Sequence, residues 1–428
     1  MILIIFALIF LLTMIIGVPI AFILGITSLT YLLFFARIPL EVVGQNLFSG
    51  VNSFVLLAIP FFIMAGELMN RTNITQDLID FSDLLVGRLP GSLAQINIVV
   101  SILFAGLTGA AVADTAAIGS VLIPSMKKEG YSSAYSAAVT TASSIIGPII
   151  PPSIVMVIYG SITGNSIGSL FVAGVVPGIL IGLGLMTMAL YFAVKENHPR
   201  RTTAMPFKKK FEVTKKAILG ILAPVIIIGG ILSGMFTPTE AAAVACAYAF
   251  LIGVLVFKNI GFQDIKESLY NSAVISATIL LIISTADLFG MVLTIERIPT
   301  QIASLLMTYV DSKILFILII NVFLLFMGMI METAANVILL APILIPVAVE
   351  FGLHPLHFAL IMLVNLNIGL TTPPLGVCMF TAVPIANTSF EKIARKVMPF
   401  VGMEIAVLLI ISFVPELVLF VPRLFGFL

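Results

Sequence analysis

Charged side chains are scarce in this sequence: they make up 10% of its 428 residues, whereas 60% are hydrophobic. Soluble domains carry about a quarter charged residues, so this scarcity argues against a soluble fold. Apolar windows of the ~20 residues that a membrane-spanning helix needs recur along the whole chain. The sequence therefore predicts an all-α polytopic membrane protein. A net charge of +1 gives no reason to expect a nucleic-acid partner.

Residues for enzyme chemistry are equally rare. The two cysteines, Cys246 and Cys378, stand alone in apolar segments and are expected to be small buried side chains. Of the three histidines, His354 and His357 lie three residues apart but flank Pro355, and no carboxylate completes a metal-ligand cluster. No nucleophile–base pair is evident, and a GxxxxGK[ST] phosphate-binding loop is absent. We therefore expect neither an enzyme nor an ATP-hydrolysing pump.

Proline and glycine, in contrast, occur where a membrane helix should exclude them. The stretch "SSIIGPIIPPSIVMVIYG" (143–160) is apolar enough for a bilayer, yet it contains Gly147, Pro148 and a Pro-Pro pair. Proline removes a backbone donor and clashes with the preceding turn. A second such stretch, "NLNIGLTTPPLGVCMFTA", covers 365–382. Irregular backbone at membrane depth is tolerated only where it is buried in protein or lines a cavity, so both stretches are predicted to be broken helices beside a site.

The two broken stretches belong to an internal repeat, roughly 41–195 and 265–428. Gly147 matches Gly369 and Pro151 matches Pro373, both 222 residues apart. Upstream, "DTAA" from Asp114 matches "ETAA" from Glu332 only if the second copy carries four extra residues. Corresponding interrupted helices in two halves are a sequence pointer to the binding site of a transporter.

Each broken stretch is preceded by a segment too long and too rich in small residues for one smooth helix. Residues 96–126 are predicted to form a re-entrant helical hairpin with its tip near Gly106–Asp114. Residues 318–348 are predicted to form the partner hairpin, with its tip near Gly328–Asn336. The segment 195–216 holds eight of the 21 Lys and Arg residues, which predicts a cytoplasmic loop.

These features divide the chain into a scaffold and a transport core. The predicted division is 1–94, N-terminal scaffold helices; 95–195, core repeat 1 with the hairpin 96–126 and the broken helix 133–165; 196–216, basic cytoplasmic loop; 217–312, second scaffold part; 313–390, core repeat 2 with the hairpin 318–348 and the broken helix 356–386; and 391–428, C-terminal helices.

Asp114 and Glu332 are carboxylates in apolar surroundings, which indicates function by default. Each could instead cap the outgoing arm of its hairpin, accepting from free backbone N–H groups. The nearby hydroxyl and amide groups could bind a ligand or simply bond their own helix backbone. Freed carbonyls and hydroxyls suit a hard cation such as Na⁺. The predicted Na⁺ residues are Ala105, Gly106, Gly109, Asp114, Thr115, Gly147, Gly328, Glu332, Thr333, Gly369, Thr371 and Thr372.

An anionic substrate is expected at the same depth, attracted by helix N-termini. The predicted substrate residues are Gly109, Ala110, Ser144, Pro151, Thr333, Asn336, Thr372 and Pro373. The "TPTE" segment at 237–240 has a local explanation, a capping box with Pro238 at the first helical position, which we favour over a substrate contact.

The segments "AGLTGAAVADTAAIG", "IIGPIIPPSIVMVIYG", "VAGVVPGIL", "GMFTPTEAAAVA" and "NIGLTTPPLG" together resemble the large membrane subunit of TRAP (tripartite ATP-independent periplasmic) transporters. The resemblance runs end to end and looks strongest to the sialic-acid branch. It implies two inverted repeats working by an elevator mechanism, in which the core slides against the scaffold. It further implies a Na⁺-coupled importer of an organic acid, either a C4-dicarboxylate or sialic acid, in the bacterial inner membrane, with no organic cofactor.

The resemblance also implies two protein partners: a small four-helix membrane subunit and a periplasmic substrate-binding protein. The alternative functions are a stand-alone divalent anion/Na⁺ symporter, which needs no binding protein, and, less favoured, a channel.

Overall fold

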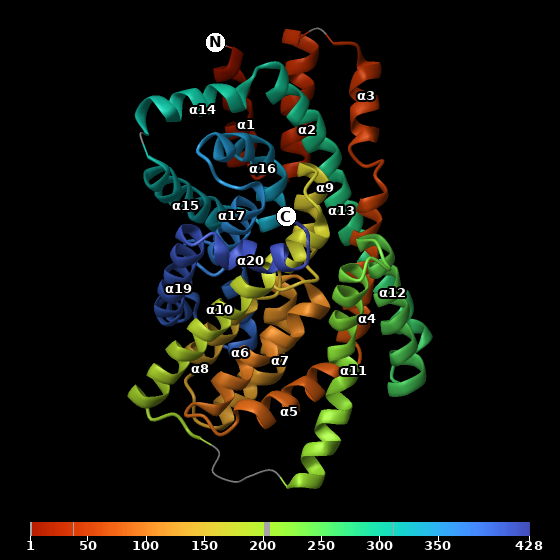
Figure 1. Ribbon diagram of the computed structural model, residues 1–428, viewed down its shortest axis with the longest axis vertical. Coiled ribbons are helices and arrows are strands. Elements are labelled where there is room, and N and C mark those ends of the chain that lie inside the picture. The colour runs from red at the N-terminus through yellow and green to blue at the C-terminus, as the bar shows by residue number, and fades with distance from the viewer. Residues whose placement is uncertain (1, 37, 201–205, 311) are drawn as a thin grey trace.

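The computed structural model describes residues 2–36, 38–200, 206–310 and 312–428, and these ranges form helices without a strand. Seven of the described helices are long and apolar enough to cross a membrane. An eighth span results if Glu41–Ser49 and Phe54–Asn70, which meet at an angle of 53°, are counted together. The all-α, multispanning fold predicted from composition is therefore confirmed (Figure 1).

The helices fall into four consecutive groups. The first group is α1 (Ile2–Ile15), α2 (Ile20–Tyr31), η1 (Leu32–Ala36), α3 (Leu40–Ser49), η2 (Phe54–Leu57), α4 (Ala58–Asn70) and α5 (Ile74–Val86). The second is α6 (Ser92–Thr108), α7 (Ala111–Lys128), α8 (Ser133–Ser144), α9 (Ile154–Thr163) and α10 (Ile167–Lys195). The third is α11 (Phe207–Leu232), α12 (Pro238–Leu251), η3 (Ile252–Phe257), α13 (Phe262–Ile295) and α14 (Ile298–Tyr309). The fourth is α15 (Lys313–Ile330), α16 (Thr333–Glu350), α17 (Pro355–Gly369), α18 (Val377–Ala386), α19 (Phe390–Phe413) and α20 (Glu416–Leu424).

The second and fourth groups are two copies of one arrangement. In each, two helices form a hairpin (α6–α7 and α15–α16), and two shorter helices follow that are separated by a break containing the Pro-Pro pair (α8–α9 and α17–α18). The bond within each Pro-Pro pair is cis. In Figure 1 the first hairpin lies in the lower half of the view and the second in the upper half.

The structure corrects one detail of the repeat. Helices α7 and α16 begin at Ala111 and Thr333, which are 222 residues apart, so the second copy has no four-residue insertion. Asp114 therefore corresponds to Asn336 and not to Glu332. Glu332 is the N-cap of α16, whereas Asp114 lies one turn inside α7, whose N-cap is Ala110. The similar segments "DTAA" and "ETAA" therefore occupy different positions relative to the start of their helices.

The two copies interlock. The hairpin arm α7 packs against α18 of the other copy, and α16 packs against α9. In the same way α19 packs against α8, and α10 against α17. Each broken helix is therefore enclosed by elements of both copies, and the two copies form one body. Buried amides strengthen both halves: Asn97 donates to Thr140 Oγ1 at 2.7 Å, and Asn365 donates to Asn321 Oδ1 at 2.7 Å.

The remaining helices lie beside this body. Helix α13 packs on α2, α3 and α4, α12 packs on α4, and α11 packs on α5 and α12. The capping box predicted at 237–240 is confirmed: Thr237 and Glu240 bond each other's backbone N–H, with Pro238 as the first helical residue.

The basic segment differs from the loop predicted for 196–216. Helix α11 begins at Phe207, so Lys208–Lys210, Lys215 and Lys216 lie on a helix. Lysine has a good helix propensity, and nothing from Phe207 onward interrupts the first turns. Arg201, part of the predicted loop, lies outside the described residues.

Candidate functional site

The tip of the first hairpin is a two-residue turn. Helix α6 ends at Thr108, Gly109 has a left-handed backbone with φ of 62°, and Ala110 is extended. Only glycine adopts this conformation without cost. A Cβ on Gly109 would also lie 2.9 Å from the Pro152 carbonyl oxygen. The tip therefore rests directly on the Pro-Pro break of its own repeat.

Asp114 fills the space behind this tip. It has no solvent exposure, and one of its oxygens accepts a hydrogen bond from the Thr108 hydroxyl. No described residue donates to the other oxygen, Oδ2. That atom lies against Gly147, where an added Cβ would be 2.1 Å away. The alternative that Asp114 caps α7 is wrong, because the carboxylate binds a side chain and not the free N–H groups of the helix.

The residue that follows Asp114 links α7 to the end of α8. The Thr115 hydroxyl donates to Ser144 Oγ at 2.8 Å, and both residues are buried. Asp114, Thr115, Ser144 and Gly147, all predicted for this site, therefore lie together. Ala105 and Gly106 lie in the last turn of α6, where Gly106 faces the ring of Pro224 on α11; their role at a cation site stays a prediction.

The tip of the second hairpin is stabilised differently. Glu332 is the N-cap of α16, and its carboxylate accepts from the backbone N–H groups of Ala334 at 3.0 Å and Ala335 at 3.4 Å. The capping role considered for Glu332 is thus confirmed. The Asn336 amide donates back across the tip to the carbonyls of Met327 at 3.1 Å and Met331 at 3.0 Å.

This tip also rests on the break of its own repeat. A Cβ on Gly369 would lie 2.3 Å from the backbone of Gly328, so neither position has space for a side chain. The Thr333 hydroxyl donates to Asn367 Oδ1 at 3.2 Å. Thr371 and Thr372 both donate to the Ile368 carbonyl, at 2.9 and 2.8 Å.

The two tips meet at a cavity of about 370 Å³. The first hairpin contributes Gly109 and Ala110, and the second contributes Glu332 and Thr333. Helix α13 supplies the facing wall, which consists of Val274, Ile275, Thr278, Ile279 and Ile282. Of the eight predicted substrate residues, Gly109, Ala110 and Thr333 line this cavity. The other five, Ser144, Pro151, Asn336, Thr372 and Pro373, are not among its lining residues.

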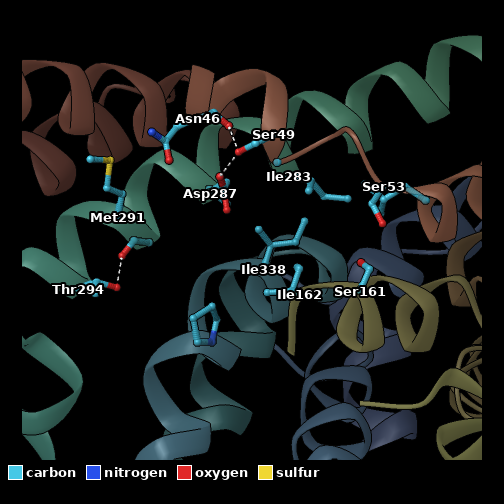
Figure 2. A pocket seen from close by; sticks show the side chains of 15 residues that line it. Asn46, Ser49, Ser53, Ser161, Ile162, Ile283, Asp287, Met291, Thr294 and Ile338 are labelled. Carbon is cyan, nitrogen blue, oxygen red and sulfur yellow. Dashed lines mark hydrogen bonds between the residues drawn. The ribbon is translucent and has the colours of Figure 1, made fainter. Parts of the chain in front are cut away.

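A second cavity, of about 450 Å³, adjoins the first and shares Ile338 with it. It lies between the segment that joins α3 to α4, helix α13, and the helices α9 and α16 (Figure 2). Its walls carry more polar groups, among them Ser53, Ser161 and Asp287, whose carboxylate lies 3.4 Å from the Ser49 hydroxyl. Sequence reasoning did not identify this cavity, because its lining comes from four separate regions of the chain.

Helix ends provide the positive potential of the tip cavity. The segments 96–126 and 318–382 contain no Lys or Arg. The N-terminus of α7 lines the cavity and has no side-chain cap, whereas Glu332 caps the N-terminus of α16. A helix N-terminus with free N–H groups attracts anions, so an anion fits best at Ala110–Val112.

The residues around Asp114 fit a hard cation. Such ions take oxygen ligands in proteins, and two oxygens face the Cβ position of Gly147: Asp114 Oδ2, to which no described residue donates, and the Ser144 carbonyl oxygen. A cation there would also compensate a charge that burial otherwise makes costly.

Sequence reasoning missed three residues of this region. Thr108 bonds Asp114, and Asn367 bonds Thr333 and lines the cavity. Glu404, on α19, is fully buried. Glu404 had a signal in the sequence, because it is the only charged residue between positions 397 and 415. An ionisable residue inside an apolar span is a functional candidate by default.

Comparison with known proteins gives one consistent result. The family model described as "Tripartite ATP-independent periplasmic transporter, DctM component" matches residues 7–417. The large permease protein SiaM of a sialic acid TRAP transporter from Vibrio cholerae is 37% identical and is covered over 96% of both chains. The C4-dicarboxylate TRAP transporter large permease protein DctM from Rhodobacter capsulatus is 36% identical, over 96% of this chain and 97% of that protein.

Two further similarities concern length and fold. The isethionate TRAP transporter permease protein DctMQ from Oleidesulfovibrio alaskensis is 38% identical over 96% of this chain, which spans 65% of that longer protein. Among solved structures, the YdaH transporter of Alcanivorax borkumensis superposes with a TM-score of 0.63 at 13% identity, over 90% of this chain and 88% of that one. At that identity the superposition supports the fold alone.

Proposed function

Because the chain belongs to the DctM component family of the tripartite ATP-independent periplasmic transporters, we propose that it is a Na⁺-coupled importer of an organic acid that works by an elevator mechanism. The chain is a large permease for organic acids and not an enzyme, and it is a multi-pass protein of the bacterial inner membrane. Na⁺ coupling, the substrate, the mechanism and the partners are the proposed parts.

One observation carries the proposal: the two hairpin tips meet at a cavity, and an incompletely bonded buried carboxylate, Asp114, lies directly behind one tip. An anionic substrate at the α7 N-terminus would be close to a cation at Asp114. Each would stabilise the other, because no lysine or arginine in 96–126 or 318–382 supplies a compensating charge. The substrate and Na⁺ should therefore raise each other's affinity by the same factor.

The elevator mechanism has support in the walls of the tip cavity. The second tip contributes the polar residues Glu332 and Thr333, and α17 contributes Asn367, whereas the wall from α13 is apolar apart from Thr278. An apolar wall forms no directional bonds that would have to break when the two repeats slide past it. The adjoining cavity between α3, α13 and α16 would serve as an approach to the tips.

Sialic acid is the first substrate to test, since it is the substrate named for SiaM, and C4-dicarboxylates, isethionate and 2,3-diketo-L-gulonate follow from the names of the other relatives. The partners we propose are a small four-helix membrane subunit and a periplasmic binding protein. The fused name DctMQ of the isethionate relative, together with the larger size of that protein, is consistent with a membrane partner for this chain.

The test is uptake into liposomes that contain the chain and the small subunit, with and without the binding protein outside. Labelled substrate should accumulate under a Na⁺ gradient, and replacing Na⁺ by K⁺ should abolish uptake. Uptake that needs no binding protein would identify the stand-alone anion/Na⁺ symporter instead. Undiminished uptake in K⁺ under a pH gradient would show proton coupling and refute the Na⁺ assignment.

A further inference from the structure

The two adjoining cavities have opposite electrostatic character. Helices α7 and α9 begin at the tip cavity, whose wall includes their first residues, Ala111 and Ile154. Helices α3 and α9 end at the second cavity, whose wall includes Ser49 and Ser161 from their last turns. A helix carries a partial positive charge at its N-terminus and a partial negative charge at its C-terminus. An anionic group is therefore favoured in the tip cavity and disfavoured in the second cavity.

Asp287 adds a full negative charge to the second cavity. It is an exposed residue of α13, and Figure 2 shows it beside Ser49, with Ile338 and Ile162 on the other side of the cavity. A Cβ on Gly50 would lie 2.7 Å from the Cβ of Asp287, so the end of α3 and this carboxylate belong to one wall. None of the described residues that line either cavity is a lysine, an arginine or a histidine. The charge of Asp287 is therefore not balanced by a cationic side chain of these walls.

The hydroxyl groups of the second cavity offer mainly acceptors to a ligand. The hydroxyls of Ser161 and Thr294 each donate to a backbone carbonyl of their own helix, at 2.9 and 2.8 Å. The Ser49 hydroxyl has the Asn46 carbonyl at 3.2 Å and the Asp287 carboxylate at 3.4 Å as its acceptors. A hydroxyl has one proton and two lone pairs, so the capacity that these groups keep free is that of an acceptor. A ligand hydroxyl or N–H group can donate to them, whereas an ionised carboxylate, which only accepts, cannot.

We propose that Asp287 determines substrate specificity: it selects acids that carry one carboxylate and several hydroxyl or N–H groups, and it disfavours acids with a second carboxylate at the far end. The carboxylate of the substrate lies in the tip cavity, and its hydroxyl-bearing part lies in the second cavity. From Ile154 to Ser161 helix α9 rises about 10 Å along both cavities, so the substrate needs a reach of that order. A sugar acid meets these requirements. Oxidation of its terminal CH₂OH group to a carboxylate would place a second negative charge beside Asp287.

The inference rests on the proposed transport of an organic acid, and it is tested on the purified chain alone, because a binding protein would impose its own selectivity. The measurement is the thermal unfolding midpoint at constant NaCl during titration with two matched pairs of acids: sialic acid and its C9-carboxylic acid, and gluconate and glucarate. The shift of the midpoint gives the affinity for each acid. The wild type should bind the monoacid of a pair more tightly than the diacid. D287N should raise the affinity for the diacid relative to the monoacid by at least about fivefold, because it removes the repulsion between two like charges.

Two further variants complete the design. E350Q removes a negative charge from an exposed position of α16 outside both cavities and should keep the wild-type ratio of affinities. N46K adds a positive charge to the wall of the second cavity and leaves Asp287 in place. It should therefore also favour the diacid, and it serves as the test if D287N cannot be purified.

Three results would contradict the role of Asp287. The first is a wild type that binds the diacids as tightly as the monoacids, and the second is a ratio of affinities that neither D287N nor N46K changes. The third is a wild type that is stabilised by succinate but by neither monoacid. If none of these acids stabilises the wild type, the proposed function itself fails, and the inference fails with it.

Discussion

The contact between Gly147 and Asp114 allows a quantitative prediction for the proposed cation site at Asp114. A methyl group at Gly147 would lie 2.1 Å from Asp114 Oδ2, 3.1 Å from its Cγ and 3.2 Å from the Ser144 carbonyl oxygen. Ordinary contacts begin near 3.4 Å, so in Gly147→Ala the carboxylate must retreat by about 1.3 Å. The carboxylate cannot move that far and keep both its bond to Thr108 and its place beside Thr115 and Ser144.

Overpacking of this kind costs about 1–3 kcal/mol of stability. The loss for Na⁺ should be separate and additional, because the displaced oxygen no longer points to the cation. We expect at least about a tenfold weaker Na⁺ response, which corresponds to ~1.4 kcal/mol. The assay is the unfolding midpoint in Na⁺ and in K⁺ at equal ionic strength, followed by Na⁺-driven uptake in liposomes.

Gly229→Ala is the matched control. Nothing lies within 4 Å of the Cβ position of Gly229, which is in the helical interior of α11. Alanine there should stabilise the helix by about 0.5–1 kcal/mol and leave the Na⁺ response unchanged. If Gly147→Ala unfolds at the wild-type temperature and responds to Na⁺ with wild-type affinity, Asp114 is not held against Gly147 and the reasoning fails.

Three further predictions concern other parts of the molecule. Thr237→Ala removes the capping box of α12 and should lower the free energy of unfolding, measured by chemical denaturation, by about 1 kcal/mol. The control Thr214→Ala removes only a bond to the Lys210 carbonyl within α11 and should change this free energy little. Equal effects of the two substitutions would contradict the capping role. Burial lowers the pKa of His198 below 6.5, although Glu196 at 3.3 Å opposes the shift. The contribution of His198 to the free energy of unfolding should therefore be complete above pH 6.5 and be lost as the pH falls below that value. His198→Gln should flatten this profile of unfolding midpoint against pH. Gly369→Ala places a methyl group 2.3 Å from the Gly328 backbone and should reduce uptake while the protein still inserts into the membrane; wild-type uptake would show that the second tip does not need this close contact.

The sequence alone was sufficient for the class of fold, the family and the broken spans. The clustered Gly and Pro residues from Gly147 to Pro152 and from Gly369 to Pro374 disfavour a continued helix, more strongly than the single prolines that lie inside helices such as α10. The hairpins were predicted for 96–126 and 318–348, and the tips of the structure fall within the predicted ranges because small residues mark a tight turn between apolar arms. The capping box at Thr237 was equally local, since its partners are three residues apart.

Only the tertiary structure decided what each polar residue contacts. In the sequence Asp114 and Glu332 look equivalent, yet Glu332 caps a helix and Asp114 bonds Thr108 against Gly147. The cavity joins Gly109, Thr333 and the α13 wall from three distant regions. Backbone geometry and capping depend on neighbours along the chain, which the sequence displays. The partners of a buried carboxylate depend on which helices pack together, and that is settled only by the interlocking of the two repeats.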